Sequence, residues 1–155
     1  MKINSIFFLL LLLAVSTSSC SSSKAVTYQR SGKVTCSQYA EGVITVISEA
    51  NAQNKRAAVA FAERNAVENL LFKGIPSSNQ EKPIIPNEPE ALQKNTAYFS
   101  NLIDSTGYQK FIMHSEPLNF SSDQGTMHVK QKIKFDLNAL RSDLEQNKII
   151  RKFGL

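Results

Sequence analysis

Residues 126–135 constrain the fold of this chain more than any other segment, because two kinds of side chain alternate along them. One series is apolar apart from Gln131 and contains Met127, Val129, Ile133 and Phe135. The other series contains His128, Lys130, Lys132 and Lys134. A period of two predicts a β-strand with one buried face and one wet, cationic face, as strands of antiparallel sheets have.

The neighbouring segments extend this strand into a larger unit. Residues 108–118 predict a partner strand, and residues 121–125 predict the turn of a β-hairpin. After the hairpin, Asp136 or Asn138 caps a final helix. The residues that face inward in this helix are Leu137, Leu140 and Leu144.

The first half of the chain begins with strands and continues with a helix. Residues 34–39 and 43–47 are rich in β-branched side chains, and Glu41-Gly42 between them is either a hairpin turn or a bulge in one bent strand. A helix then begins near Lys55, capped by Asn51 or Asn54. Its main apolar stripe consists of Val59, Ala62, Ala66 and Leu70, and it ends at Gly74 and Pro76.

Two aromatic residues of this helix, Phe61 and Phe72, fall nearly opposite the main stripe. Either a second helix covers them, or they contact a partner. Natural domains rarely leave such a patch bare, which favours the covering helix.

A long loop and a second helix follow. Residues 75–88 contain three prolines, and loops of this length inside a small domain are sometimes functional. Pro89 fits the first turn of a helix that is capped by Asn87 and ends at Gly107. The stripe of this helix is Leu92, Thr96, Phe99 and Ile103.

The elements therefore follow the order strand or strands, helix, helix, hairpin, helix. This order predicts an α+β fold, with a small antiparallel or mixed sheet covered by about three helices. We expect one such domain over residues 32–155, because the chain is short enough for a single core.

The N-terminus predicts export. Lys2, an apolar run and small residues up to Ser19 have the order of a signal peptide, and the run is too short to span a bilayer. The whole chain has 155 residues and a net charge of +5. Loss of residues 1–19 leaves 136 residues and, without Lys2, a charge of +4.

Cys20 follows the small residues directly and precedes a serine tract. This arrangement resembles the lipobox of bacterial lipoproteins, although Thr17 stands where that family usually has leucine. The resemblance implies cleavage before Cys20 and acylation, including palmitate, of that cysteine. It also implies anchoring in the outer membrane, because Ser21 is not the aspartate associated with inner-membrane retention, and we favour the periplasmic face. Residues 20–31 would be the lipidated flexible tether. A plain secretory signal with an incidental Cys20 is the alternative.

Cys36 is the only other cysteine. If Cys20 is lipidated, no disulfide forms within the chain. If it is not, Cys20 and Cys36 can form a disulfide. We interpret Cys36 as a buried small residue rather than a nucleophile, since no base accompanies it in sequence.

Motifs for catalysis and cofactors are missing from the sequence. It contains no phosphate-binding glycine loop, no zinc-protease motif and no nucleophile elbow, so we expect a non-enzymatic binding module without a cofactor or metal. His114 and His128 lie on the two predicted hairpin strands and would make a poor zinc site even if they met. A small enzyme acting on cell-wall or glycan material, with dispersed active-site residues, is the alternative.

The stripe of Lys130, Lys132 and Lys134 is the best polar feature. It is either a solvated face that also protects a sheet edge, or a contact surface for anionic lipids or an acidic envelope polymer. We expect no nucleic-acid partner, because no aromatic residue is interleaved with the lysines.

The mature chain also resembles a known group of domains. An alanine-rich helix ending in AVENLLFKGI, and the later run VKQKIKFDLNALRSDLEQNKII, are similar to the LPP20 lipoproteins and to the N-terminal domain of the flagellar protein FlgT. This resemblance implies a helix packed on a short sheet and a role as a scaffolding or assembly accessory of the envelope. It does not extend to the proline-rich loop or the second helix, and it carries over no functional residues.

Overall fold

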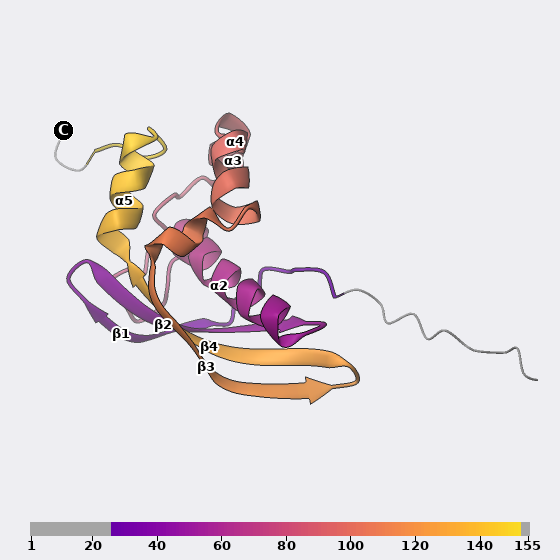
Figure 1. Ribbon diagram of the computed structural model, residues 1–155. Coiled ribbons are helices and arrows are strands. Elements are labelled where there is room, and N and C mark those ends of the chain that lie inside the picture. The colour runs from indigo at the N-terminus through magenta and orange to yellow at the C-terminus, as the bar shows by residue number, and fades with distance from the viewer. Residues whose placement is uncertain (1–25, 153–155) are drawn as a thin grey trace, which may run out of the picture.

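A computed structural model describes residues 26–152 of the chain (Figure 1). The strands are β1 (Val34–Ala40), β2 (Val43–Ala52), β3 (Ile112–Asp123) and β4 (Thr126–Asp136). The α-helices are α2 (Lys55–Phe72), α3 (Glu88–Lys94), α4 (Thr96–Phe99) and α5 (Leu137–Gln146). A π-helical turn (Ser100–Asp104) and a 3-10 helix (Gly107–Phe111) lie between α4 and β3. The predicted signal peptide and Cys20 lie outside the described residues.

The four strands form one antiparallel sheet in the order β1-β2-β4-β3. The predicted α+β class is therefore confirmed. Of the two interpretations of Glu41-Gly42, the hairpin is correct, because a turn with Gly42 at φ +72° joins β1 to β2. A bulge does occur in β1, but between Cys36 and Gln38.

The two faces of the sheet differ, because helices pack against only one of them (Figure 1). The covered face lies against α2 and carries fully buried residues, among them Ile44, Val46, Ile133 and Phe135. Since side chains alternate along a strand, the lysines of β4 point to the opposite face. Within residues 26–152 no helix covers that second face, which we call the open face.

Helix α2 begins at the predicted place. The side chain of Asn54 accepts a hydrogen bond from the backbone nitrogen of Ala57 at 2.9 Å, which satisfies one of the free donors of the first turn. Further along, residues 65–72 are all buried, polar ones included. One cause is the loop after the helix, where Ile84 and Ile85 are buried and donate backbone hydrogen bonds to the last turn of α2.

The predicted second helix is interrupted, which corrects the prediction of one continuous element. Asn95 leaves the helical conformation at φ −131° and ψ 40°, and its side chain donates to the carbonyl of Ala91 at 3.1 Å. Such local bonds let asparagine compete with helix continuation. Residues 108–111 also differ from the prediction: they form a 3-10 helix, not a strand, because Tyr108 and Phe111 turn into the core.

Residues 26–31, which we call the strap, lie along α2. The sequence assigned them to the flexible tether, but the Tyr28 hydroxyl donates to Glu68 at 3.0 Å and the Asn69 side chain donates to the Ser31 carbonyl at 3.1 Å. Tyr28 and Ser31 are therefore attached to α2, and the predicted flexible tether does not extend over them. Because the segment is polar, its sequence gives no sign that Tyr28 and Ser31 bind to α2.

The aromatic side of α2 is covered from within the chain. The Phe72 ring is 8% exposed and lies 5.8 Å from the ring of Phe99 in α4. Of the two options for Phe72, the favoured covering helix is therefore the one observed, and the alternative partner contact at Phe72 is not. Phe61 packs edge-on against Tyr28 of the strap, with ring centroids 5.2 Å apart. Phe61 stays partly exposed, and a partner contact there stays a prediction.

Candidate functional site

One row of residues crosses the open face from edge to edge. Gln38 of β1 pairs with Thr45 of β2, and Thr45 pairs in turn with Lys134 of β4. Lys134 then pairs with His114 of β3. Neighbours in such a row have Cβ atoms about 5 Å apart, so their side chains can meet on one ligand.

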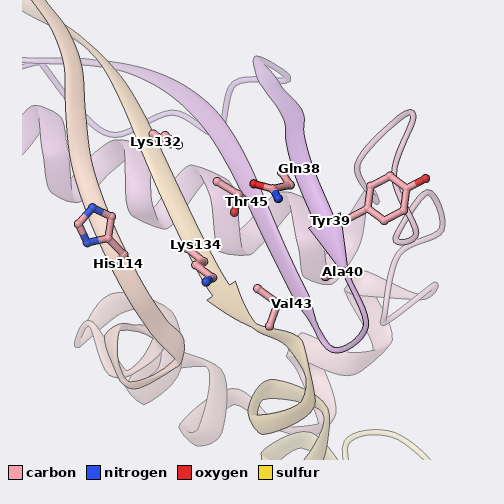
Figure 2. A pocket seen from close by; sticks show the side chains of 8 residues that line it. All are labelled: Gln38, Tyr39, Ala40, Val43, Thr45, His114, Lys132 and Lys134. Carbon is pink, nitrogen blue, oxygen red and sulfur yellow. The ribbon is translucent and has the colours of Figure 1, made fainter.

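This row lines a cavity of about 430 Å³, which we call the open-face cavity. The rest of its lining is Tyr39, Ala40, Val43 and Lys132. Figure 2 shows the lining side chains on the near side of the sheet, with α2 behind it and the Tyr39 ring pointing away at the outer edge. The lining offers ammonium, imidazole, amide and hydroxyl groups, and none of these eight residues carries a carboxylate. It therefore suits an anion.

The three predicted lysines all reach the open face, but they differ in their pairing. Lys130 lies outside the cavity, with its Nζ 3.8 Å from Glu49. The Nζ of Lys132 lies 3.4 Å from Glu116. Lys134 is exposed and makes no ion pair with any residue between 26 and 152. A negatively charged ligand would therefore find an uncompensated cation at Lys134.

Glu116 keeps this division of charge in place. Its Oε2 lies 3.4 Å from His114 Nε2. The hydrogen bond from His114 and the neighbouring ammonium of Lys132 hold the pKa of the Glu116 carboxyl below its usual range. Glu116 is thus ionised at neutral pH and pairs with Lys132 and His114. Lys134 is then the strongest hydrogen-bond donor of the row that is free to bind a ligand.

The lysines do not protect a sheet edge, because β4 is an inner strand. This corrects that part of the sequence interpretation. The edge strand β3 instead contains Pro117, which has no N–H to offer a further strand, and a bulge between Pro117 and Asn119.

The two histidines do not approach each other. His114 pairs with Lys134, whereas His128 pairs with Ser121 and lies six residues earlier on β4, roughly 20 Å away along the strand. In the described part of the chain, no group of three or more metal-ligating side chains occurs. Residues 26–152 also contain no helix that is long and apolar enough to cross a membrane.

Cys36 is half-buried and packs against the main core, so the interpretation of Cys36 as a buried small residue is partly right. Burial raises the pKa of its thiol above the ordinary value. A raised pKa leaves less thiolate at neutral pH, which does not suit a nucleophile.

A buried polar cluster explains the polar position in the inward series of β4. The Ser115 hydroxyl donates to Glu63 at 2.7 Å, and the Gln131 side chain donates to Ser115 Oγ at 2.7 Å. Gln131 is 1% exposed and lies away from the open face. These bonds join α2 to both strands of the hairpin, a structural role.

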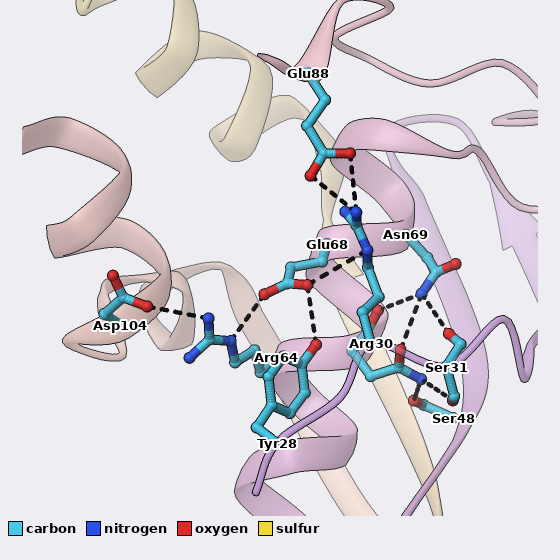
Figure 3. A network of polar contacts seen from close by, with 10 residues as sticks. Tyr28, Arg30, Ser31, Ser48, Arg64, Glu68, Asn69, Glu88 and Asp104 are labelled. Carbon is cyan, nitrogen blue, oxygen red and sulfur yellow. Dashed lines mark hydrogen bonds and ion pairs between the residues drawn. The ribbon is translucent and has the colours of Figure 1, made fainter. Parts of the chain in front are cut away.

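A second polar cluster, the clamp, holds the strap on α2 (Figure 3). Glu68 lies at its centre and accepts hydrogen bonds from Tyr28 at 3.0 Å and from Arg64 Nε at 2.8 Å. Arg30 Nη2 reaches Glu88 at 2.8 Å, and its Nε lies 3.6 Å from Glu68. The remaining ion pair joins Arg64 to Asp104 at 3.0 Å. All the charged groups of the clamp are paired, so we interpret it as structural.

Sequence reasoning found the cationic half of the site and missed Gln38 and Thr45. Both were visible only as members of β-strands, and neither pattern nor spacing linked them to Lys134. The link comes from the order β1-β2-β4-β3, which places β2 beside a strand about 90 residues later in the chain.

Comparisons with known protein families, with curated proteins and with solved structures find no match for this chain. We therefore infer the function from the site and from the N-terminal sequence.

Proposed function

We propose that this protein is a lipid-anchored binding domain of the bacterial cell envelope, and that it holds an anionic group of another envelope component on its open face. The observation that carries the proposal is the open-face cavity, in which Lys134 has no ion pair among the described residues. The anchor is proposed from the lipobox-like sequence around Cys20, which also favours the outer membrane and its periplasmic face.

The lining residues suggest how binding would work. The ammonium of Lys134 would attract a phosphate or carboxylate, and the neutral donors of Gln38 and Thr45 would orient it. Val43 and Ala40 would exclude water on one side. Binding without chemistry fits a scaffolding or assembly accessory, the role that the resemblance to LPP20 and FlgT domains implies.

Binding of anions by single-lysine variants tests this function. We expect inorganic phosphate and a carboxylate-bearing glycan fragment to shift the backbone NMR signals of Thr45, His114 and Lys134. A hydrogen bond to a charged group contributes about 1.5–3 kcal/mol, so Lys134→Gln should weaken binding roughly tenfold or more.

Lys130→Gln is the matched comparison, because Lys130 lies on the same face of the same strand but outside the cavity. We expect it to weaken binding by no more than about twofold. Equal losses in the two variants would show that general charge, rather than the cavity, attracts the anion and would overturn the proposal.

A further inference from the structure

The strap joins the folded domain at one end of the sheet. Val26 and Thr27 line the same hollow as Asn51 and His128. Asn51 pairs with His128 close to the last residue of β2 and the first of β4, beside the start of α2. We call this the hairpin end, because the β3–β4 turn extends from it (Figure 1).

The open-face cavity lies at the opposite end. Its residues Ala40 and Val43 flank the β1–β2 turn, which is the other end of β2. β2 has ten residues, so its two ends are roughly 30 Å apart. The cavity and the point where the chain enters the domain are therefore separated by most of the length of the sheet.

The clamp limits how far the folded domain can lie from the proposed lipid on Cys20. Five residues lie between Cys20 and Val26, and whatever their conformation the six steps from Cys20 to Val26 span at most about 22 Å. If the chain were free as far as Gly32, the reach would be about 43 Å. The shorter reach is less than the length of β2, so it excludes the inverted arrangement in which β2 stands upright with the cavity at the membrane and the hairpin end away from it.

Charge at the hairpin end is compatible with an anionic bilayer surface. Lys33, Lys55 and Arg56 are exposed there, and Lys33 has 76% of its side chain exposed. The acidic residues of this end are Glu49, which lies 3.8 Å from both Lys33 and Lys130, and Asp123. The cations outnumber the carboxylates.

We propose that the clamped strap orients the domain on its membrane, with the hairpin end toward the lipid and the open-face cavity away from it. The inference rests on the proposed lipidation of Cys20. It deepens the proposed function by naming the source of the ligand: an anionic group on the aqueous side, rather than a headgroup of the membrane that holds the anchor.

Two labels at the ends of β2 test the orientation. The full chain, lipidated at Cys20 and carrying Cys36→Ser, receives a fluorophore at Gln53→Cys or at Glu41→Cys. Both positions are exposed turn residues, one at each end of the strand. In vesicles of phosphatidylethanolamine and phosphatidylglycerol with a headgroup-attached quencher, we expect label 53 to be quenched several-fold more than label 41.

Two changes to the experiment show whether the strap or the surface charge sets the orientation. Insertion of about twelve Gly and Ser residues after Lys24 leaves the clamp intact and lengthens the chain between Cys20 and the strap. The ratio of quenching at label 53 to quenching at label 41 should then fall toward one. In vesicles of phosphatidylcholine alone the difference should persist, because the strap sets it. Loss of the difference in these neutral vesicles would mean that charge alone orients the domain, against the inference.

The outcomes also separate this inference from the proposed function. Protein that does not float with the vesicles overturns the proposed anchor and the orientation together. Protein that floats with equal quenching at both positions, or with stronger quenching at position 41, overturns the orientation alone.

Discussion

At the scale of single residues, two glycines hold positions that depend on different physical causes. Gly74 ends α2 at φ +82°, and a Cβ atom there would lie 2.0 Å from the backbone oxygen of Glu81. Gly125 in the β3–β4 turn has φ +79°, but a Cβ atom there would meet nothing within 4 Å. The first position combines a conformational requirement with a close approach of the loop, and the second has only the conformational one.

Alanine substitutions separate these two causes. Gly125→Ala should lower the free energy of unfolding by about 1–2 kcal/mol, the usual difference for a left-handed residue. Gly74→Ala should lower it by clearly more, because the returning loop must also move. Urea unfolding followed by circular dichroism measures both values, and equal losses would show that the loop does not pack as described.

At the scale of elements, three tyrosine hydroxyls each join two segments. Tyr28 joins the strap to α2 through Glu68, and Tyr98 joins α4 to α5 through Asp143 at 2.7 Å. Tyr108 joins the 3-10 helix to α2 through the carbonyl of Ala60 at 3.2 Å. Burial raises the pKa of each phenol, to about 12 for Tyr108, where Glu63 adds to the effect.

Stability should therefore fall in alkali. The unfolded chain releases the phenol protons near pH 10, while the folded chain retains them, so the free energy of unfolding decreases as pH rises above about 10. Tyr108 alone should account for about 1 kcal/mol by pH 11. The check is urea unfolding between pH 8 and about 11, in which Tyr108→Phe should show a shallower decline; an identical decline would contradict the assignment to Tyr108.

Local signals in the sequence predict the elements better than they predict the contacts between elements. Two helix caps, at Asn54 and Asp136, depend only on nearby residues, and so does the alternation along β4. These features could therefore be predicted from the sequence. The break at Asn95 could not, because the apolar stripe continues through it. The strap was missed for a related reason: Tyr28 gains its partner only when α2 brings Glu68 beside it.

At the scale of the whole molecule, the proposals describe one arrangement. The covered face of the sheet forms the core with α2, and the open face presents the cavity around Lys134. The clamp fixes the entry of the chain at the end remote from that cavity. A domain built in this way would hold an anionic partner at a set side of the membrane, provided that Cys20 carries the lipid.

Membrane fractionation of two cysteine variants tests whether Cys20 carries the lipid. We expect the unaltered chain and Cys36→Ser both to sediment with the outer membrane. Cys20→Ala should be exported without acylation and be recovered in the soluble fraction or with an uncleaved signal peptide. The intact mass of the membrane-bound chain should show acyl groups at a mature N-terminal Cys20. If Cys20→Ala associates with membranes as strongly as the unaltered chain, with the signal peptide cleaved and no acyl mass on either protein, Cys20 is not the lipid anchor.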